Sequence, residues 1–384
     1  MPDLAAPNMK VATADHPTRL RYCRRCVYPE TKPGIRFDAE DICSGCRAQE
    51  RKRSVDWSAR LEELRALCAR CRSDDGGYDC VVPISGGKDS HLQVYYMKEI
   101  LGMHPLCVHV APQTTTALGA ANLQNLQDRF GVDIVTLRLN PATECRITRH
   151  WMATRAWPNW GHDKAIYAWP AQVAINFGVR LLVMGENHDY ESGGKDTGDG
   201  AAAASQMLHS LDGEPDSTAW AAAGVHKSEI APYLSPSPEA LDDAGLNVIW
   251  LGYYVNWDGF GVYLRARDLG FRPLDRTPEG LIDTYCGIDD PVVQVNGWLK
   301  FIKFGFARVS DVAFNHISYD RMTRARAVEL VNAHEGRLDP VFKRAWLDYT
   351  GVDETSFDAI VDRFANRDVV AFTDGRWRLK QPVR

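Results

Sequence analysis

The sequence predicts an α/β protein in which helices cover both faces of a parallel twisted sheet, with a small cysteine-rich module in front of the sheet. From about residue 78, short apolar runs such as "YDCVVPI", "HPLCVHV" and "VDIVTLRL" alternate with helical stretches such as "SHLQVYYMKEIL" and "LGAANLQNLQDRFG". Strands alternating with helices of about a dozen residues are typical of βαβ units and a parallel sheet. Two closely spaced cysteine pairs before residue 50 indicate the separate module.

Composition limits the class of protein. The chain has 384 residues, of which 45% are hydrophobic and 25% charged, which is typical of a soluble globular protein with two or three domains. The net charge of -5 gives no basic field, so we do not expect a nucleic-acid partner. No apolar run reaches the roughly 20 residues that span a bilayer, and the first residues lack the apolar stretch of a signal peptide. We therefore expect a cytoplasmic protein with no membrane partner.

The cysteine module contains two C-x-x-C pairs. Cys23 and Cys26 form the first, Cys43 and Cys46 form the second, and sixteen residues separate the pairs. Each pair can hold one side of a tetrahedral ion, so we predict a zinc ribbon. Four thiolates leave no open coordination position, which makes a structural role the expectation. Two disulfides, or four unrelated thiols, are the alternative reading.

A helical pattern covers about residues 47 to 72, with leucines recurring at helical spacing. Its pair Cys68 and Cys71 has no further ligand nearby in sequence, so we interpret these two as packing thiols. The whole chain is then expected to be organised as follows: a disordered or extended N-terminus (1–20), the zinc ribbon (21–50), a linking helix (51–77), a nucleotide-binding core (78–190), a mobile loop or lid (191–240), the rest of the catalytic domain with substrate-binding elements (241–345) and a C-terminal helical extension (346–384).

The stretch "SGGKDS" directly follows the first predicted strand of the core. Ser85, Gly86 and Gly87 should therefore lie at the carboxyl end of that strand, and a helix should begin near Asp89. Two successive glycines let several N–H groups point into one concavity, and the helix N-terminus adds partial positive charge. An anion site is predicted. The pattern is neither a Walker A loop nor G-x-G-x-x-G. A glycine-rich connection without a ligand is the alternative.

This stretch resembles a known signature. S-G-G-x-D-S after a first β-strand is characteristic of the PP-loop ATP pyrophosphatases, and the resemblance implies a fold of the HUP/PP-loop type. In that family the loop holds the pyrophosphate end of ATP while the α-phosphate is attacked. The reaction yields AMP and pyrophosphate, and it adenylates an amide-type or carboxyl oxygen that a nitrogen or sulfur nucleophile then displaces.

Further stretches resemble one branch of this family, the N-acetyl sugar amidotransferases. They are "CRRCVYPETKPGIRFDAEDICSGC", "APQTTTALGAANLQNL", "VMGENHDYESGG", "GWLKFIKFGFARVSD" and "DRMTRARAVELV", so the resemblance covers about residues 22 to 345. It implies an ATP-dependent enzyme that adenylates the acetamido oxygen of an N-acetyl sugar, for which a nucleotide-linked sugar is the expected form, and replaces this oxygen with ammonia. The product would be an acetamidino sugar for a surface polysaccharide or glycan. "ENHDYESGG" and "RMTRARA" depart from the branch pattern, which leaves the sugar and the acceptor group open.

The resemblance and the loop chemistry together give the candidate site residues. The expected catalytic residues are Lys88, Asp89 and Glu186. The expected ATP-binding residues are Ser85, Gly86, Gly87, Lys88, Asp89, Ser90, Val110, Gly185 and Asn187. Asp89 is also the candidate ligand for Mg²⁺, with helix capping as its alternative role. The candidate substrate-binding residues are His162, Lys164, Glu191, Lys300, Lys303 and Arg308, of which the basic residues after 297 have a solvated helix face as their alternative.

The source of nitrogen is the remaining question. Position 2 is proline, and none of the ten cysteines sits in a glutaminase elbow, so ammonia should come from solution or from a separate glutaminase subunit. The resemblance implies the latter, and a homo-oligomer is also open. A rival reading is a PP-loop sulfurtransferase acting on tRNA or a small molecule, which would use Cys145 and Cys286.

Overall fold

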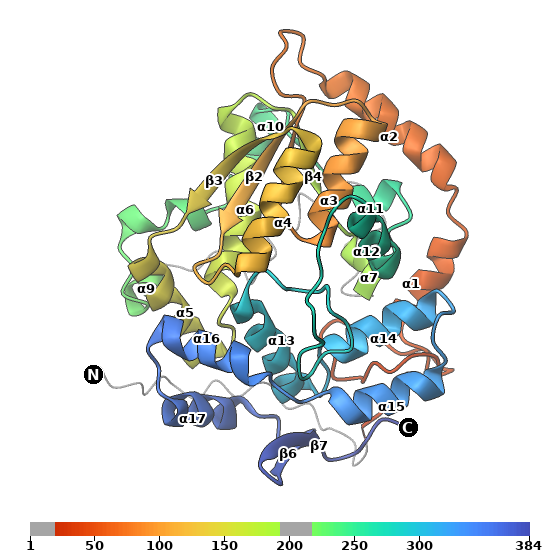
Figure 1. Ribbon diagram of the computed structural model, residues 1–384, viewed down its shortest axis with the longest axis vertical. Coiled ribbons are helices and arrows are strands. Elements are labelled where there is room, and N and C mark those ends of the chain that lie inside the picture. Colours follow the sequence, from red (N-terminus) through yellow and green to blue (C-terminus); the bar gives the residue numbers. More distant parts are fainter. Residues whose placement is uncertain (1–19, 193–216) are drawn as a thin grey trace.

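A five-stranded, entirely parallel sheet forms the centre of the protein (Figure 1). The computed structural model describes residues 20–192 and 217–384. The strand order is β3-β2-β1-β4-β5. The strands are β1 (Cys80–Pro83), β2 (Pro105–Ala111), β3 (Asp133–Arg138), β4 (Leu181–Met184) and β5 (Asn247–Trp250). The predicted α/β class is confirmed. Because the order reverses between β1 and β4, a crevice opens at their carboxyl ends, where sheets of this kind bind ligands.

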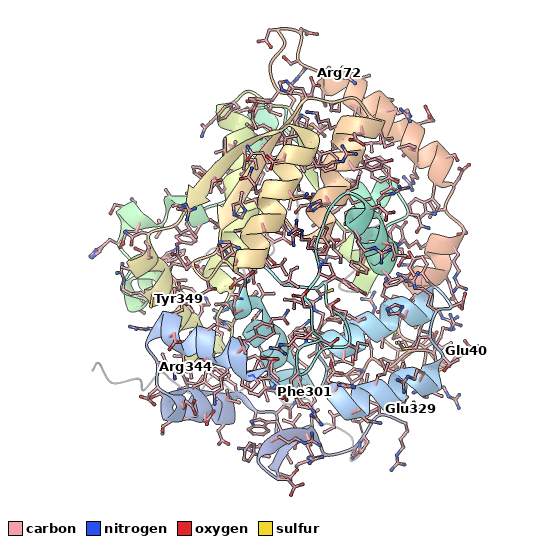
Figure 2. All side chains as sticks on the ribbon, viewed as in Figure 1. Glu40, Arg72, Phe301, Glu329, Arg344 and Tyr349 are labelled. Atoms are coloured by element: carbon pink, nitrogen blue, oxygen red, sulfur yellow. The ribbon has the colours of Figure 1, made fainter. Side chains whose placement is uncertain are left out.

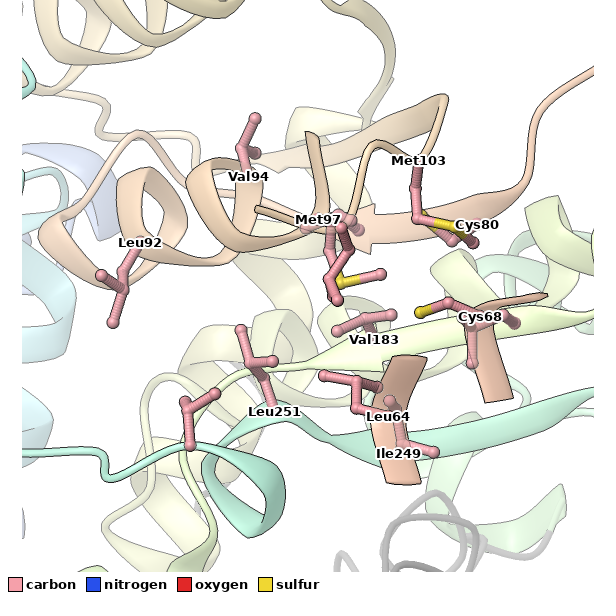
Figure 3. Close-up of a cluster of buried hydrophobic side chains, with 14 of the residues drawn as sticks. Leu64, Cys68, Cys80, Leu92, Val94, Met97, Met103, Val183, Ile249 and Leu251 are labelled. Carbon is pink, nitrogen blue, oxygen red and sulfur yellow. The ribbon is translucent and has the colours of Figure 1, made fainter. Parts of the chain in front are cut away.

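Helices pack on both faces of the sheet, and successive strand residues point to opposite faces. Cys80 and Val82 of β1 join the core cluster on one face, whereas Val81 joins the cluster on the other. The first face is covered by α2 (Trp57–Cys71), α3 (Lys88–Val94) with the π-helical turn Tyr95–Ile100, and α4 (Ala117–Phe130). Figure 3 shows Leu64 and Cys68 of α2 within this cluster. The second face is covered by α6 (Trp160–Asn176) and α10 (Pro238–Asp243). Cys68 and Cys71 are buried packing thiols, as expected.

The linking helix expected over 51–77 is wrong in its bounds. Two helices occupy this region, α1 (Ser44–Arg53) and α2 (Trp57–Cys71). The break follows from Asp56, whose carboxylate accepts hydrogen bonds from the backbone N–H groups of Ser58 and Ala59 and so caps a new helix. The helical periodicity continues across this break, so the sequence predicted one helix where the structure has two.

The expected lid is also revised. Its residues 193–216 lie outside the described residues, as do residues 1–19 of the expected extended N-terminus. Residues 217–240 form α9 (Ser217–Ala222), the 3₁₀ turns Lys227–Glu229 and Ala231–Tyr233, and the start of α10. Trp220 and Tyr233 are buried against Trp151 of α5 (Pro141–Arg155) and Trp160 of α6. This part is therefore packed on two helices, because its aromatic side chains supply an apolar anchor.

The C-terminal part follows β5 and is mostly helical. Its elements are α11 (Leu251–Tyr254), α12 (Gly259–Asp268), α13 (Pro291–Phe304), α14 (Arg308–Ser318), α15 (Arg324–His334), α16 (Pro340–Thr350), α17 (Glu354–Phe364), β6 (Val370–Thr373) and β7 (Arg376–Leu379), and α7 (His188–Ser192) precedes it after β4. Figure 2 shows Phe301 of α13 and Tyr349 of α16 in this region. The helical extension expected over 346–384 is wrong in one respect, because β6 and β7 form an antiparallel hairpin. Asp374 and Gly375 both have positive φ and form its turn.

This C-terminal segment does not stand apart from the residues before it. Trp346, Phe357 and Trp377 share one buried cluster with Leu299 and Phe301 of α13. Among residues 20–192 and 217–384, no helix has the length and apolar character required to cross a bilayer.

Glu144 of α5 gives a prediction about stability and pH. The Tyr233 hydroxyl donates to its carboxylate at 2.7 Å, and burial raises the pKa of Glu144 from 4.5 to about 7. The folded protein then binds more protons than the unfolded chain between these two values, so this stability is present below about pH 4.5 and is lost as the pH rises through about 7. We expect wild type to lose up to about 3 kcal/mol relative to Glu144→Gln between about pH 5 and about pH 8. Urea unfolding at both pH values measures this, and a pH-independent difference would contradict it.

Candidate active site

The loop between β1 and α3 approaches α4 so closely that residue 86 has no room for a side chain. Gly86 has φ +85°, and a Cβ there would lie 2.7 Å from the backbone nitrogen of Leu123. Two serines hold the loop from within. The Ser85 N–H donates to the Ser90 hydroxyl at 2.9 Å, and the Gly87 N–H donates to the Ser85 hydroxyl at 3.2 Å. Residues Ser85–Ser90, which we call the phosphate loop, are therefore held as a tight turn at the end of β1.

A pocket of about 290 Å³ lies at the carboxyl ends of β1 and β4. Five separate parts of the chain form its walls. Its lining residues include Ser85, Gly87, Lys88 and Asp89 of the phosphate loop, Glu186 and Glu191 after β4, Trp257 and Gly259 before and at the start of α12, the segment 285–289, and Arg308, Asp311 and Asn315 of α14. Among the predicted site residues, Glu186, Glu191 and Arg308 therefore line the same pocket as the phosphate loop.

Opposite charges are closely balanced within the phosphate loop. The Lys88 Nζ lies 2.6 Å and 2.7 Å from the two carboxylate oxygens of Asp89. Burial disfavours the charge of Lys88, yet the Asp89 carboxylate raises the pKa of Lys88 above its usual value. Burial also raises the pKa of Asp89, and nearby Glu186 adds to this effect. Asp89 is therefore a carboxylate whose ionised form an added cation would stabilise.

Further carboxylates face the same pocket. Burial raises the pKa of Asp289 to about 6, and the neighbouring Asp290 adds to this. Burial works against ionisation of Glu186 as well, but His188, Lys88 and Arg308 lower its pKa overall. Asp89, Glu186 and Asp289 thus place carboxylate oxygens, the donors that hard divalent cations prefer, around one pocket, but among the described residues these three do not bring their oxygens together as one ligand cluster.

Arg308 is the pocket's second cation, and it begins α14. The Glu335 carboxylate accepts from the Ala307 N–H at 2.5 Å, from the Ser310 N–H at 3.2 Å and from the Ser310 hydroxyl. Glu335 thereby caps α14 in place of a local N-cap residue. This carboxylate fixes the helix start, and so it sets the position of the Arg308 backbone.

Several predicted substrate residues lie elsewhere. The Lys300 Nζ pairs with Asp311 at 2.9 Å, and the Lys303 Nζ donates to the Ala156 carbonyl at 3.0 Å; neither residue lines the pocket. His162 lines a separate small hollow with Glu144 and Asp290, and burial lowers the pKa of this histidine to about 4. Lys164 is buried on α6, outside the pocket lining.

The predicted ATP-binding residues outside the phosphate loop are placed as follows. Val110 is buried in the core cluster next to α5 and α6 and does not line the pocket. Gly185 and Asn187 flank Glu186 directly after β4. A Cβ on Gly252 would lie 2.7 Å from the Asn187 backbone nitrogen, so the stretch after β5 packs tightly against this turn.

The four cysteines of the N-terminal module converge on one point. Their ligand atoms all lie within 4.8 Å of one another, the Cys23 and Cys46 sulfurs are 3.8 Å apart, and the Cys26 and Cys43 sulfurs are 3.6 Å apart. Tetrahedral zinc with Zn–S bonds of about 2.3 Å requires sulfurs about 3.8 Å apart, so the donor set fits Zn²⁺. All four are free thiols, which excludes the disulfide alternative.

Comparison with known proteins finds a family match for the C-terminal part of the chain. Residues 279–383 match the family described as "LPS biosynthesis protein WbpG-like, C-terminal domain". This C-terminal part is similar to that domain, and we refer to residues 279–383 as the WbpG-like domain. An uncharacterised protein of Methanocaldococcus jannaschii, MJ1599, is 28% identical over 116 residues, which are 30% of this chain and 42% of that protein. The chain thus spans less than half the length of the curated relative it matches.

The comparison with solved structures gives three matches at low similarity. NMN synthetase from Francisella tularensis has 12% identity and a TM-score of 0.38, covering 78% of this chain and 98% of that chain. The NH3-dependent NAD synthetase from Campylobacter jejuni has 11% identity and a TM-score of 0.30, covering 58% and 100%. The U34-tRNA thiolase NcsA from Methanococcus maripaludis has 14% identity and a TM-score of 0.27, covering 78% and 87%.

The WbpG-like domain supplies pocket residues that the sequence reading missed. Tyr285, Asp289, Asp311 and Asn315 line the pocket, and all four lie within residues 279–383. The segment that carries Tyr285 and Asp289 has no regular secondary structure, so no periodicity marks it. The one local signal is Asp290 followed by Pro291, because this pair is typical of a helix start. It predicts a helix that begins directly after Asp289.

The first prediction from this site concerns residue 86. Gly86→Ala should weaken ATP binding at least about tenfold, because the added Cβ collides with the α4 backbone at a φ that alanine rarely adopts. Isothermal titration with Mg·ATP measures the effect. Gly178→Ala is the matched control, since Gly178 also has positive φ but no atom lies within 4 Å of its Cβ position. Equal affinity in wild type and Gly86→Ala would contradict the role of the close approach.

The second prediction concerns the metal. The purified chain should contain about one zinc ion, and Cys26→Ser should lose most of it, because one of four buried ligands is removed. Elemental analysis measures the content. Cys107→Ser, a buried cysteine of the sheet core, should keep its zinc. Full zinc content in Cys26→Ser would show that this cluster is not the metal site.

Proposed function

We propose that this chain is an ATP-dependent N-acetyl sugar amidotransferase that converts an acetamido group to an acetamidino group and releases AMP and pyrophosphate. The observation that carries the proposal is the phosphate loop, which shares one pocket with Arg308 and the carboxylates of the WbpG-like domain. The description of that domain as part of an LPS biosynthesis protein supports a bacterial surface sugar as the acceptor. The sequence stretches that resemble the amidotransferase branch support the same reaction.

The phosphate loop would hold the leaving pyrophosphate. Ser85, Gly87 and Lys88 of the loop line the pocket, and the Lys88 Nζ would exchange its contact with Asp89 for a phosphate oxygen. Asp89 would hold Mg²⁺, which supplies charge neutralisation of the pyrophosphate when it is bound. Catalysis of this step rests on positioning and electrostatics, since the nucleophile must meet the α-phosphorus in line.

The acceptor half-reaction follows from the chemistry of an amide. The acetamido oxygen attacks the α-phosphorus, an O–P bond forms, and the bond to pyrophosphate breaks. Ammonia then attacks the activated carbon, and AMP leaves with the former amide oxygen. Glu186, whose pKa lies below its usual value, is ionised and would accept a proton from the incoming ammonium or from the tetrahedral intermediate. Arg308 would hold the diphosphate of a nucleotide-linked sugar.

Ammonia would come from a separate glutaminase subunit or from solution. Cys286 is the one cysteine that lines the pocket among the described residues, and burial together with Asp283 raises its pKa to about 12. A thiol with so high a pKa is a poor nucleophile at neutral pH. This supports the expectation that the chain hydrolyses no glutamine by itself.

The presence of Cys286 in the pocket keeps one alternative, a PP-loop sulfurtransferase. Two cysteines acting together would be required, and Cys145 is the second candidate. The Cys145 thiol instead donates to the backbone carbonyls of Tyr349 and Thr350 at 3.7 Å and 3.8 Å, at the end of α16 and outside the pocket lining. This geometry favours the amidotransferase.

The reaction itself provides the test. Incubation with ATP, Mg²⁺, ¹⁵N-ammonium and a panel of nucleotide-linked acetamido sugars should yield AMP, pyrophosphate and a sugar in which ¹⁵N replaces the amide oxygen, because the adenylated oxygen leaves with AMP. Mass spectrometry follows the sugar, and a coupled assay follows pyrophosphate. Arg308→Ala should raise the KM for the nucleotide sugar at least about tenfold, since it removes the bidentate phosphate contact.

Control variants separate the alternatives. Arg53 is an exposed residue of α1, so Arg53→Ala should leave the KM for ATP and the KM for the nucleotide sugar unchanged. The double variant Cys145→Ser, Cys286→Ser should still form the amidine, whereas sulfur transfer would disappear. Release of ADP and inorganic phosphate, or loss of all product in the double variant, would overturn the proposed function.

A further inference from the structure

The helix that leaves the cysteine module ends at the pocket wall. The Cys43 side chain caps α1, Cys46 lies in its first turn, and Lys52 lies in its last turn. Lys52 is 3% exposed, and its Nζ contacts Glu191 at 2.5 Å, the Tyr319 hydroxyl at 2.9 Å and the Trp257 carbonyl. Glu191 and Trp257 both line the pocket. One short, rigid helix therefore joins two of the cysteines to a pocket carboxylate.

A second arm leaves the other cysteine pair and reaches a different wall. Tyr28 follows Cys26 by two residues, and its N–H donates to the Cys26 sulfur at 3.5 Å. Its hydroxyl donates to Asp311 at 3.0 Å, and its ring packs against Phe306 and Phe314 around α14. Asp311 lines the pocket on the same helix turn as Arg308. The two cysteine pairs thus have separate polar contacts to the two pocket walls.

These two contacts differ in kind from the other ion pairs of the module. Arg25 with Glu50, and Arg47 with its acidic neighbours, lie on the surface and are accessible to water. Exposed pairs of this kind contribute little to stability or to position. Lys52 and Tyr28 are buried, and their partners are pocket carboxylates. A module that served only its own folding would have no need to place its buried polar atoms on the substrate site.

We propose that the cysteine module positions the pocket carboxylates Glu191 and Asp311 through Lys52 and Tyr28, so that metal occupancy of the module and nucleotide binding in the pocket are coupled. This inference goes beyond the proposed reaction and rests on it only in taking ATP as the ligand of the phosphate loop. Lys52 and Tyr28 are positioning residues, since neither lines the pocket. Coupling of two binding sites is reciprocal in binding free energy, so bound nucleotide must raise the affinity of the module for the metal if bound metal favours the nucleotide.

The test measures, at equilibrium, the competition for zinc between the full chain and a chromophoric chelator, with and without saturating Mg·ATP. In wild type we expect ATP to raise the affinity for zinc by about fivefold or more, within the range typical of coupled sites. Lys52→Met and Tyr28→Phe should keep their zinc but show an increase of less than about twofold, because each removes a contact to a pocket wall. Arg47→Met, on the same helix with exposed partners, is the matched control and should behave as wild type.

A second readout is independent of ATP. Hydrogen exchange of the zinc-loaded variants should be faster than in wild type at residues 186–191 for Lys52→Met and at residues 308–312 for Tyr28→Phe. Tyr28→Phe removes a single oxygen atom, so this variant still tests the inference if Lys52→Met fails to fold. Unchanged exchange at these segments, or an equal rise in zinc affinity with ATP in wild type and both variants, would overturn the inference. A wild type that binds no ATP would instead refute the proposed function, and the exchange data alone would then decide this inference.

Discussion

The arrangement of the site depends on two close backbone contacts at either side of α4. Gly86 of the phosphate loop meets the middle of this helix, where a Cβ would lie 2.7 Å from the Leu123 nitrogen. Gly119, in the first turn, meets the WbpG-like domain, where a Cβ would lie 2.7 Å from the Asp289 Cα. The Thr116 N–H also donates to the Asp289 carbonyl at 2.9 Å. Helix α4 therefore acts as a rigid spacer that holds the phosphate loop and Asp289 at a fixed separation.

Charge imposes a second constraint on the same pocket. Its carboxylates outnumber its cations, which are Lys88 and Arg308 among the lining residues. In a buried pocket such an excess is costly, and the raised pKa values of Asp89 and Asp289 express that cost. The internal pair of Lys88 with Asp89 offsets part of it. A divalent cation at the carboxylates would offset part of this excess, and it would leave Lys88 and Arg308 available to contact anionic groups of a ligand.

Local signals in the sequence were sufficient for the sheet, the phosphate loop and the four cysteines. Each depends on residues close together in the chain, such as "SGGKDS" after an apolar run or two C-x-x-C pairs. The break at Asp56 and the hairpin turn at Asp374 and Gly375 also have local causes. The break was not predicted because the helical periodicity of the apolar residues continues on both sides of Asp56. The mobile-lid reading of 217–240 failed for a different reason. Its small and polar residues suggested a loop, whereas Trp220 and Tyr233 decide its packing through contacts with helices far earlier in the chain.

The pocket walls were less accessible to prediction because they depend on long-range contacts. Lys300, Lys303 and Arg308 share one basic stretch, yet only Arg308 lines the pocket. The difference arises at Gly305 and Ala307, where α13 ends and α14 begins in a new direction under the cap supplied by Glu335. No spacing rule in residues 300–308 contains that carboxylate. The core thus carries the phosphate loop in its own local sequence, whereas the other walls of the pocket are built by turns and caps of the WbpG-like domain. If the proposed function holds, differences in acceptor among proteins with this sheet should arise in segments such as 285–289 and the start of α14, which can change without disturbing the phosphate loop.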